Sequence, residues 1–128
     1  MTIPSTSIPA TMRALQQTSL NGPRDMRLIT DAPVPRPAEH EVLIRVTAAG
    51  VNFADISRAR GTFPGGPRPP YLAGFEAAGE IVATGDAVAG PRPGARVEHD
   101  TNWIGAASLD LARCRTALGG WNRAETAG

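Results

Sequence analysis

The chain has 128 residues, with 13 basic and 12 acidic side chains, a net charge of +1 and no long run of either sign. This length suits one domain, and the charge balance excludes the basic surface of a nucleic-acid-binding protein. The longest stretch without a charge, residues 1–12, is shorter than the ~20 apolar residues of a membrane-spanning helix. We therefore expect no nucleic-acid partner and no membrane segment.

Cysteine content and the start of the chain indicate the compartment. The single cysteine, Cys114, forms no internal disulfide and builds no thiolate metal site. The first residues lack the cationic start and the apolar centre of a secretory signal. These features predict a soluble, cytoplasmic domain.

The first part of the chain predicts an extension and two short strands. Residues 1–11 combine prolines and hydroxyl side chains without an apolar period, so we expect a disordered extension. Residues 13–20 alternate weakly and end at the turn sequence Asn21-Gly22-Pro23. A second short apolar run, 26–29, is followed by prolines at every second position, which favours an extended connector.

The clearest strand spans residues 41–49, where Val42, Ile44 and Val46 place β-branched side chains on one face. Residues 52–60 predict a short helix. Asn52 suits its N-cap, Asp55 the third helical position, and Gly61 its end.

The rest of the apolar pattern consists of a Gly/Pro loop at 61–70, a strand at 75–84, and a further strand beginning at 94–97. Glycine and proline make up about a fifth of the chain, as in turn-rich domains. Closely spaced strands with one brief helix predict a mainly β fold, a small barrel or sandwich. The pattern has no βαβ alternation.

Two segments resemble a known family. The sequence Ala49-Gly-Val-Asn-Phe-Ala-Asp55, followed by a helix and Gly61, is similar to the signature of zinc-independent quinone oxidoreductases in the medium-chain dehydrogenase/reductase superfamily. Residues 70–82, with Gly85 and 94–97, resemble the Gly-x-Glu-x-x-Gly-x-Val block of that superfamily. The resemblance covers residues 12–97 and implies the N-terminal GroES-like domain, a partly open β-barrel with one short helix.

The resemblance also implies an activity. In this family the barrel forms one side of an active-site cleft, a Rossmann domain binds NADPH on the other side, and hydride passes to a quinone or another activated alkene. No Gly-x-Gly-x-x-Gly or similar phosphate loop occurs in the 128 residues. We therefore expect no cofactor-binding domain within them and no activity from them alone. The alternative is a non-enzymatic GroES-like binding or assembly module, with a helical tail as its docking surface. We separately expect self-association through an exposed barrel face.

Two residues are candidates for cofactor binding, and no catalytic residue is assigned. By resemblance, Asn52 faces the nicotinamide and offers a hydrogen bond to cofactor or substrate. As an N-cap it would be structural, and the two roles are compatible. Ser57 stands where many quinone reductases carry a tyrosine that contacts the cofactor. Serine keeps the hydroxyl without the ring, and the alternative is a solvated helix position.

Metal binding is not expected. Zinc-dependent relatives place a cysteine at the position of Asn52 and a histidine at that of Phe75, and neither residue present here suits zinc. Asp55 is interpreted as a first-turn helix acid. Glu76 is similar to the acid beside zinc in metal-dependent relatives, and without the metal it is interpreted as a paired carboxylate in the barrel.

The family pattern stops after Val97. The divergent tail, residues 98–128, contains both tryptophans and the only cysteine. One account is a frameshift in a GC-rich coding sequence, consistent with 13 basic residues that are all arginine. The other is an amphipathic helix. It rests on apolar residues spaced by three and four, namely Ile104, Ala107, Leu111, Cys114 and Leu118.

Overall fold

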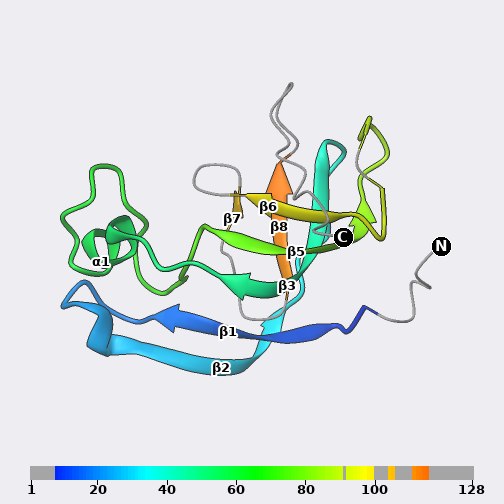
Figure 1. The fold of residues 1–128 in the computed structure, drawn as a ribbon. Coiled ribbons are helices and arrows are strands. Elements are labelled where there is room, and N and C mark those ends of the chain that lie inside the picture. The colour runs from blue at the N-terminus through cyan, green and yellow to red at the C-terminus, as the bar shows by residue number, and fades with distance from the viewer. Residues whose placement is uncertain (1–7, 91, 100–103, 106–110, 116–128) are drawn as a thin grey trace.

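The computed structural model describes residues 8–90, 92–99, 104–105 and 111–115, and these are mainly β with one α-helix (Figure 1). The strands form two antiparallel sheets, one of order β2-β1-β4 and one of order β6-β5-β3-β8-β7. Among the described strands none belongs to both sheets, which matches the expected partly open barrel. The elements are β1 (Thr11–Gln17), β2 (Met26–Pro33), β3 (Glu41–Ala49), α1 (Phe53–Ala59), β4 (Tyr71–Leu72), β5 (Ala77–Thr84), β6 (Arg96–His99), β7 (Ile104–Gly105) and β8 (Leu111–Arg115).

The smaller sheet is built on the β1–β2 hairpin. Its two strands fall on the two predicted runs, but β1 ends at Gln17 rather than at residue 20, and β2 continues past residue 29 to Pro33. The fully buried Gln17 amide donates hydrogen bonds to the carbonyls of Ser19, at 3.0 Å, and Gly22, at 2.7 Å, and so holds the turn that follows. At the other end β1 already begins at Thr11, within the predicted extension. Residues 1–7 of that extension lie outside the described part of the chain.

Strand β3 has the predicted bounds and divides the core into two clusters. Val42 and Ile44, on the predicted β-branched face, pack in one cluster with β5 and β6. On the opposite face Leu43 joins the second cluster, which lies between the two sheets. The buried members of that second cluster are Met12, Ala14, Ala32, Leu43, Val82 and Leu111.

The helical account of the tail is wrong for residues 111–115, which form strand β8 between β3 and β7. The register runs from Leu111 opposite Arg45 to Arg115 opposite Glu41. The free edge of β3 presents backbone groups that need hydrogen-bond partners, and this long-range requirement outweighs a local helical period. Ile104 lies in strand β7, while Ala107 and Leu118 lie outside the described residues.

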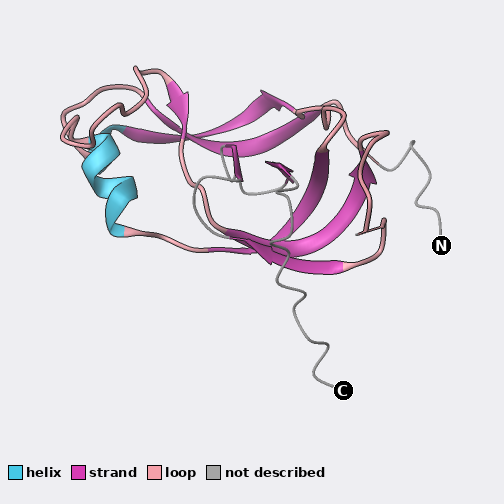
Figure 2. Cartoon of the chain, turned by 90° about the horizontal axis from the view of Figure 1, so that it is seen from above, coloured by secondary structure: helices cyan, strands magenta, loops and turns pink. Residues whose placement is uncertain are grey.

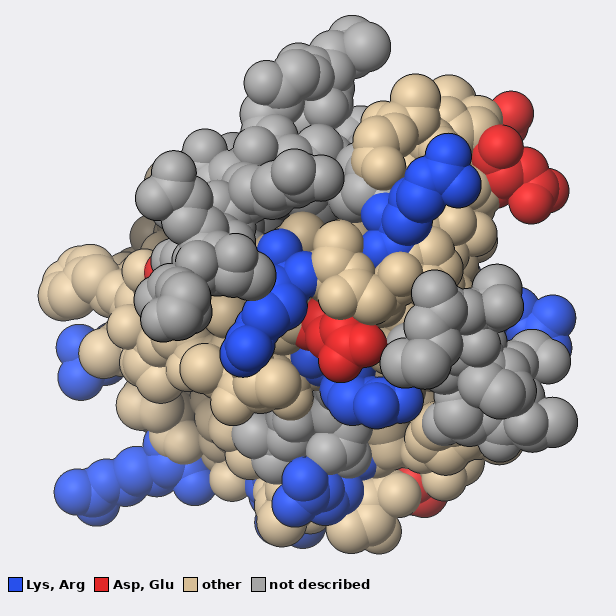
Figure 3. All heavy atoms as spheres, turned by 45° about the vertical axis from the view of Figure 1, so that its right-hand side comes forward, with Lys and Arg blue, Asp and Glu red and all other residues tan. Residues whose placement is uncertain are grey.

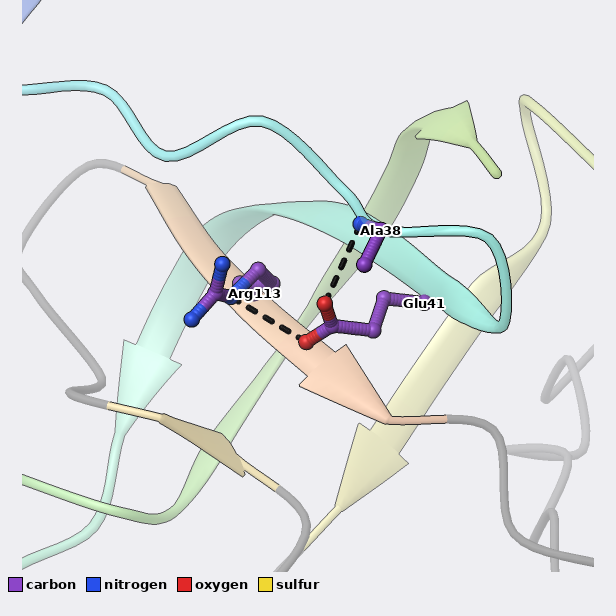
Figure 4. A network of polar contacts seen from close by, with 3 residues as sticks. All are labelled: Ala38, Glu41 and Arg113. Atoms are coloured by element: carbon purple, nitrogen blue, oxygen red, sulfur yellow. Dashed lines mark hydrogen bonds and ion pairs between the residues drawn. The ribbon is translucent and has the colours of Figure 1, made fainter. Parts of the chain in front are cut away.

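A polar contact also joins β8 to the start of β3 (Figure 4). The Glu41 carboxylate accepts a hydrogen bond from the Ala38 backbone N–H and forms an ion pair with Arg113 Nε, both at 3.1 Å. The Arg113 side chain is 44% exposed, so this pair contributes little to stability. The buried Leu111 side chain is the main contribution of β8 to the core.

Helix α1 lies at one end of the two sheets (Figure 2). The predicted helix is confirmed, with Asn52 as N-cap and Arg60 as C-cap. Two later strands are confirmed with shifted starts. β5 begins at Ala77 rather than at 75, and β6 at Arg96, after a turn in which the Ala95 N–H donates to the Arg92 carbonyl.

The charged side chains are distributed over the surface. On the face drawn in Figure 3, acidic side chains lie between the arginines. Among the described residues, no helix combines the length and the hydropathy that crossing a membrane requires.

Candidate functional site

The candidate site begins at the link between β3 and α1. The Gly50 backbone N–H donates to the Glu76 carbonyl at 3.2 Å, and the Asn52 Nδ2 group donates to Glu76 Oε2 at 3.1 Å. A Cβ at Gly50 would overlap that same carboxylate oxygen, so glycine at this position lets the Glu76 carboxylate lie against the link. The two segments of the family resemblance therefore meet through Glu76.

Asn52 has two structural roles. It occupies the N-cap of α1, as predicted, and Asp55 Oδ2 accepts a hydrogen bond from the Asn52 backbone N–H at 2.8 Å, closing a capping box. The interpretation of Asp55 as a first-turn acid is confirmed. Because the Asn52 amide has two N–H groups and donates one to Glu76, its orientation is set while a second donor remains.

Sequence reasoning missed the contact between Asn52 and Glu76. The expected pairing of the Glu76 carboxylate is observed, but its hydrogen-bond donor is a neutral amide. The one local signal was Gly50, which stands directly before Val51 and Asn52 and ends the predicted strand. The reason for a glycine at this position is the side chain of Glu76, which lies 26 residues later in the chain and packs against Gly50.

Ser57 lies on the same helix but makes a different contact. Its hydroxyl donates to the Phe53 carbonyl at 3.4 Å, a long hydrogen bond within the helix. The structure thus brings Asn52 together with Asp55 and Glu76, whereas the Ser57 hydroxyl bonds within its own helix.

An apolar cavity of about 220 Å³ lies beside this link. Its lining comes from the β1–β2 hairpin, the β3–α1 link, helix α1 and the segment after β4, so no single sequence motif predicts it. The lining residues are Leu15, Pro23, Met26, Ala49, Gly50, Val51, Asp55, Ile56, Ala73 and Gly74. Val51 and Phe53, on either side of Asn52, are 85% and 84% exposed. Asn52 therefore stands between two apolar side chains that face solvent.

A second group of side chains surrounds Arg58 of helix α1. The Arg58 guanidinium carbon lies 4.9 Å from the centre of the Phe75 ring and 5.3 Å from that of the Phe63 ring. Burial raises the pKa of Tyr71, and the neighbouring Arg58 charge opposes this rise. No sequence pattern singled out Arg58, because Phe63 lies in the predicted loop and Phe75 at the start of the predicted strand 75–84, two residues before β5.

The Tyr71 pKa predicts a loss of stability at high pH. Tyr71 is the only tyrosine, and its folded-state pKa is raised above 10.0, so the folded chain holds the phenol proton more tightly than the unfolded chain. This contribution is fully present below pH 10 and is lost as the pH rises through the folded pKa. Tyr71→Phe should therefore lose less stability than the wild type between pH 8 and about pH 11, measured by urea unfolding. An equal loss in both proteins would contradict the assignment to Tyr71.

The chemistry of the site is that of hydrogen bonding and apolar contact. In the described parts of the chain there is no group of three or more His, Cys, Asp or Glu side chains that could hold a metal ion. The ring of Phe75, at the position where zinc-dependent relatives carry a histidine, packs against Arg58. The arrangement is suited to orienting an amide or a carbonyl group next to an apolar surface.

Comparison with known proteins gives a consistent picture. Residues 38–125 match the family model described as the alcohol dehydrogenase GroES-like domain. Quinone oxidoreductase from Lama guanicoe is 43% identical over 86 residues, which cover 67% of this chain and 26% of that relative. The chain therefore spans about a quarter of the length of this curated relative. The resemblance to quinone oxidoreductases is confirmed, and the family match continues beyond Val97 to residue 125.

Solved structures agree with the sequence matches. The human synaptic vesicle membrane protein VAT-1 homolog-like protein superposes with a TM-score of 0.75 and 33% identity, covering 82% of this chain and 33% of that one. Escherichia coli quinone oxidoreductase complexed with NADPH superposes with a TM-score of 0.71 and 28% identity, covering 80% of this chain and 31% of that one. Both likenesses extend over most of the chain, and each covers about a third of the larger protein.

Proposed function

Because the chain belongs to the family of alcohol dehydrogenase GroES-like domains, we propose that it supplies one side of the active-site cleft of an NADPH-dependent quinone oxidoreductase. A nucleotide-binding domain supplies the other side, and hydride passes from NADPH to a quinone or another activated alkene. The supporting observation is the Asn52 amide, which is held by Glu76 between residues that line an apolar cavity.

The residues at the β3–α1 link fit a nicotinamide. Asn52 keeps a second N–H donor, which suits the carboxamide oxygen of that ring, and the exposed Val51 and Phe53 offer apolar contact on either side. Bound NADPH would supply the hydride at this place. The Ser57 hydroxyl is the second proposed cofactor contact, since its 3.4 Å hydrogen bond to the Phe53 carbonyl is long enough to exchange for a ligand oxygen.

In this proposal the chain acts mainly by positioning. Asn52 orients the ligand, and Glu76 is a positioning residue because its carboxylate sets the direction of the Asn52 amide. The apolar cavity excludes water from one side of the reacting groups. The anion left on the quinone or alkene after hydride transfer would take its proton from solvent, and no side chain of this chain is assigned as the acid.

The proposed domain comprises residues 12–97 together with strand β8, because Leu111 lies in the core between the sheets. We favour the account in which the tail is a genuine element, supported by the pairing of β8 with β3. We also propose a cytoplasmic location, since a single cysteine provides no internal disulfide.

The proposal predicts the activity of the chain alone, of a chimera, and of the Asn52→Ala variant of that chimera. The 128-residue chain alone should not oxidise NADPH in the presence of a quinone. A chimera in which this chain replaces the matching 86 residues of the Lama guanicoe quinone oxidoreductase should do so. In that chimera Asn52→Ala should lower kcat/KM by about tenfold to a hundredfold, as expected for a lost hydrogen bond to a ligand.

Asn21→Ala is the matched control, because Asn21 is an exposed asparagine in the β1–β2 turn. It should leave kcat/KM unchanged. Equal activity of the Asn52→Ala and Asn21→Ala chimeras, at equal NADPH affinity, would contradict the role of Asn52. Turnover by the 128 residues alone would contradict the division of the cleft between two domains.

A non-enzymatic binding or assembly module is the second candidate, favoured by the exposure of Val51 and Phe53. A helical tail is not available as its docking surface, since Leu111 is buried in strand β8. This candidate predicts a concentration-dependent oligomer that Phe53→Ser dissociates while the fold persists. A monomer at all concentrations in analytical ultracentrifugation would count against it.

A further inference from the structure

The side chain of Arg58 is held in place by aromatic rings. Its guanidinium stands over Phe75, at 4.9 Å from the ring centre, and over Phe63, at 5.3 Å. Both contacts fall within the ~6 Å range of cation–π attraction. Phe63 belongs to the 61–70 loop and Phe75 to the segment before β5, so the folded chain restrains a side chain that would otherwise be highly flexible.

The Arg58 side chain contacts two rings, but no counter-ion for it lies among the described residues. Its guanidinium makes no ion pair and no hydrogen bond with them, and its Nε is buried without an acceptor. The nearest acid along the helix, Asp55, uses its carboxylate to cap α1. The Tyr71 phenol is influenced by the Arg58 charge but is itself a neutral group at pH 7.

An unpaired, partly buried cation is costly to the fold. Burying a charge without a partner is unfavourable, and an apolar side chain between Phe63 and Phe75 would avoid that cost. A purely structural role explains the ring contacts but leaves the charge without a function. A ligand that carries negative charge would account for the ring contacts, which hold the side chain in place, and for the positive charge, which would bind the ligand.

The geometry also restricts the kind of anion. The N–H donors of a guanidinium lie along its edge, so hydrogen bonds to an anion run from that edge, in the plane of the group. That edge carries parallel N–H donors, which match the paired oxygens of a carboxylate or a phosphate. A lysine ammonium group has no such pair of parallel donors, so it would not match two oxygens in this way.

We propose that Arg58, held by its contacts with Phe63 and Phe75, is an anion-binding residue that takes a carboxylate or phosphate group through the edge of its guanidinium. The group would belong either to an acidic substrate or to a phosphate of the dinucleotide. This assignment does not depend on hydride transfer, since a binding module would recognise the same group.

NMR titration of the ¹⁵N-labelled 128-residue chain tests the proposal. The buried Arg58 Nε–H should give a resolved signal, identified by its loss in Arg58→Lys. Inorganic phosphate, benzoate and NADPH are the probes, and at least one should shift this signal with saturation, at an affinity on the order of millimolar or tighter. Stronger binding of benzoate points to an acidic substrate, and stronger binding of phosphate and NADPH to the dinucleotide.

Arg58→Gln should weaken binding of that probe at least tenfold, followed through the backbone amides of residues 58–63. Arg68→Gln is the matched control, because Arg68 is an exposed arginine of the same loop without ring contacts, and it should leave the affinity unchanged. Equal weakening in both variants, or an unsaturable shift with all three probes, would overturn the proposal. Should Arg58→Gln fail to fold, the saturation test on the wild-type Nε–H signal decides alone. That signal is independent of any NADPH oxidation.

Discussion

Leu111→Asp is expected to produce a large loss of stability. Leu111 is 4% exposed and packs between the two sheets, in the same cluster as Leu43 and Val82. An uncompensated carboxylate at this position should cost more than about 4 kcal/mol, a large part of the ~5–15 kcal/mol that stabilises a domain. Urea unfolding followed by circular dichroism measures the effect, and Leu111→Ala should cost about 2–4 kcal/mol.

Arg113→Gln is the control on the same strand. Arg113 lies two residues further along β8, is partly exposed, and loses only its ion pair with Glu41. The expected cost is at most about 1 kcal/mol. A cost for Leu111→Asp as small as for Arg113→Gln would mean that β8 is not part of the core, which would favour the frameshift account of residues 98–128. Dissociation of an oligomer without unfolding would instead support a docking role for this segment.

Gly79→Ala is expected to produce the second large loss of stability. Gly79 lies in β5 opposite Val46 of β3, and a Cβ there would overlap the Arg45 carbonyl oxygen and stand 3.0 Å from Ile44 Cγ2. The main obstacle is backbone in a central strand pair, so relief requires separation of β3 from β5. We expect a cost of about 3 kcal/mol, at the upper end for overpacked cores, and a melting temperature lower by roughly 10 °C.

Gly50→Ala provides the comparison, because its added Cβ would meet only the mobile end of the Glu76 side chain. The carboxylate can rotate away, so the melting temperature should fall less than in Gly79→Ala. The hydrogen bond between Asn52 and Glu76 should be lost, which would move the Asn52 side-chain amide signals in an NMR spectrum. Equal destabilisation by Gly50→Ala and Gly79→Ala would contradict this distinction between side-chain and backbone obstacles.

Elements with a strong local signal were predictable. Strand β3 has its predicted bounds because β-branched residues alternate over its buried face, and α1 follows from Asn52, Asp55 and Gly61. The family resemblance likewise rests on short continuous motifs, and the family match confirms it.

Three features were decided by tertiary structure. A helical spacing in the tail did not reveal β8, the two motifs did not reveal that Glu76 orients Asn52, and nothing in the sequence around Arg58 indicated its two rings. The sequence by itself determined the local periods, caps and turns, because these depend on residues within a few positions of one another. Only the folded chain decided the partner of the β3 edge, the direction of the Asn52 amide and the place of the Arg58 charge. Each of these depends on groups that lie far apart along the chain or in separate segments, and their contact energy is gained only once the sheets and the helix have packed together.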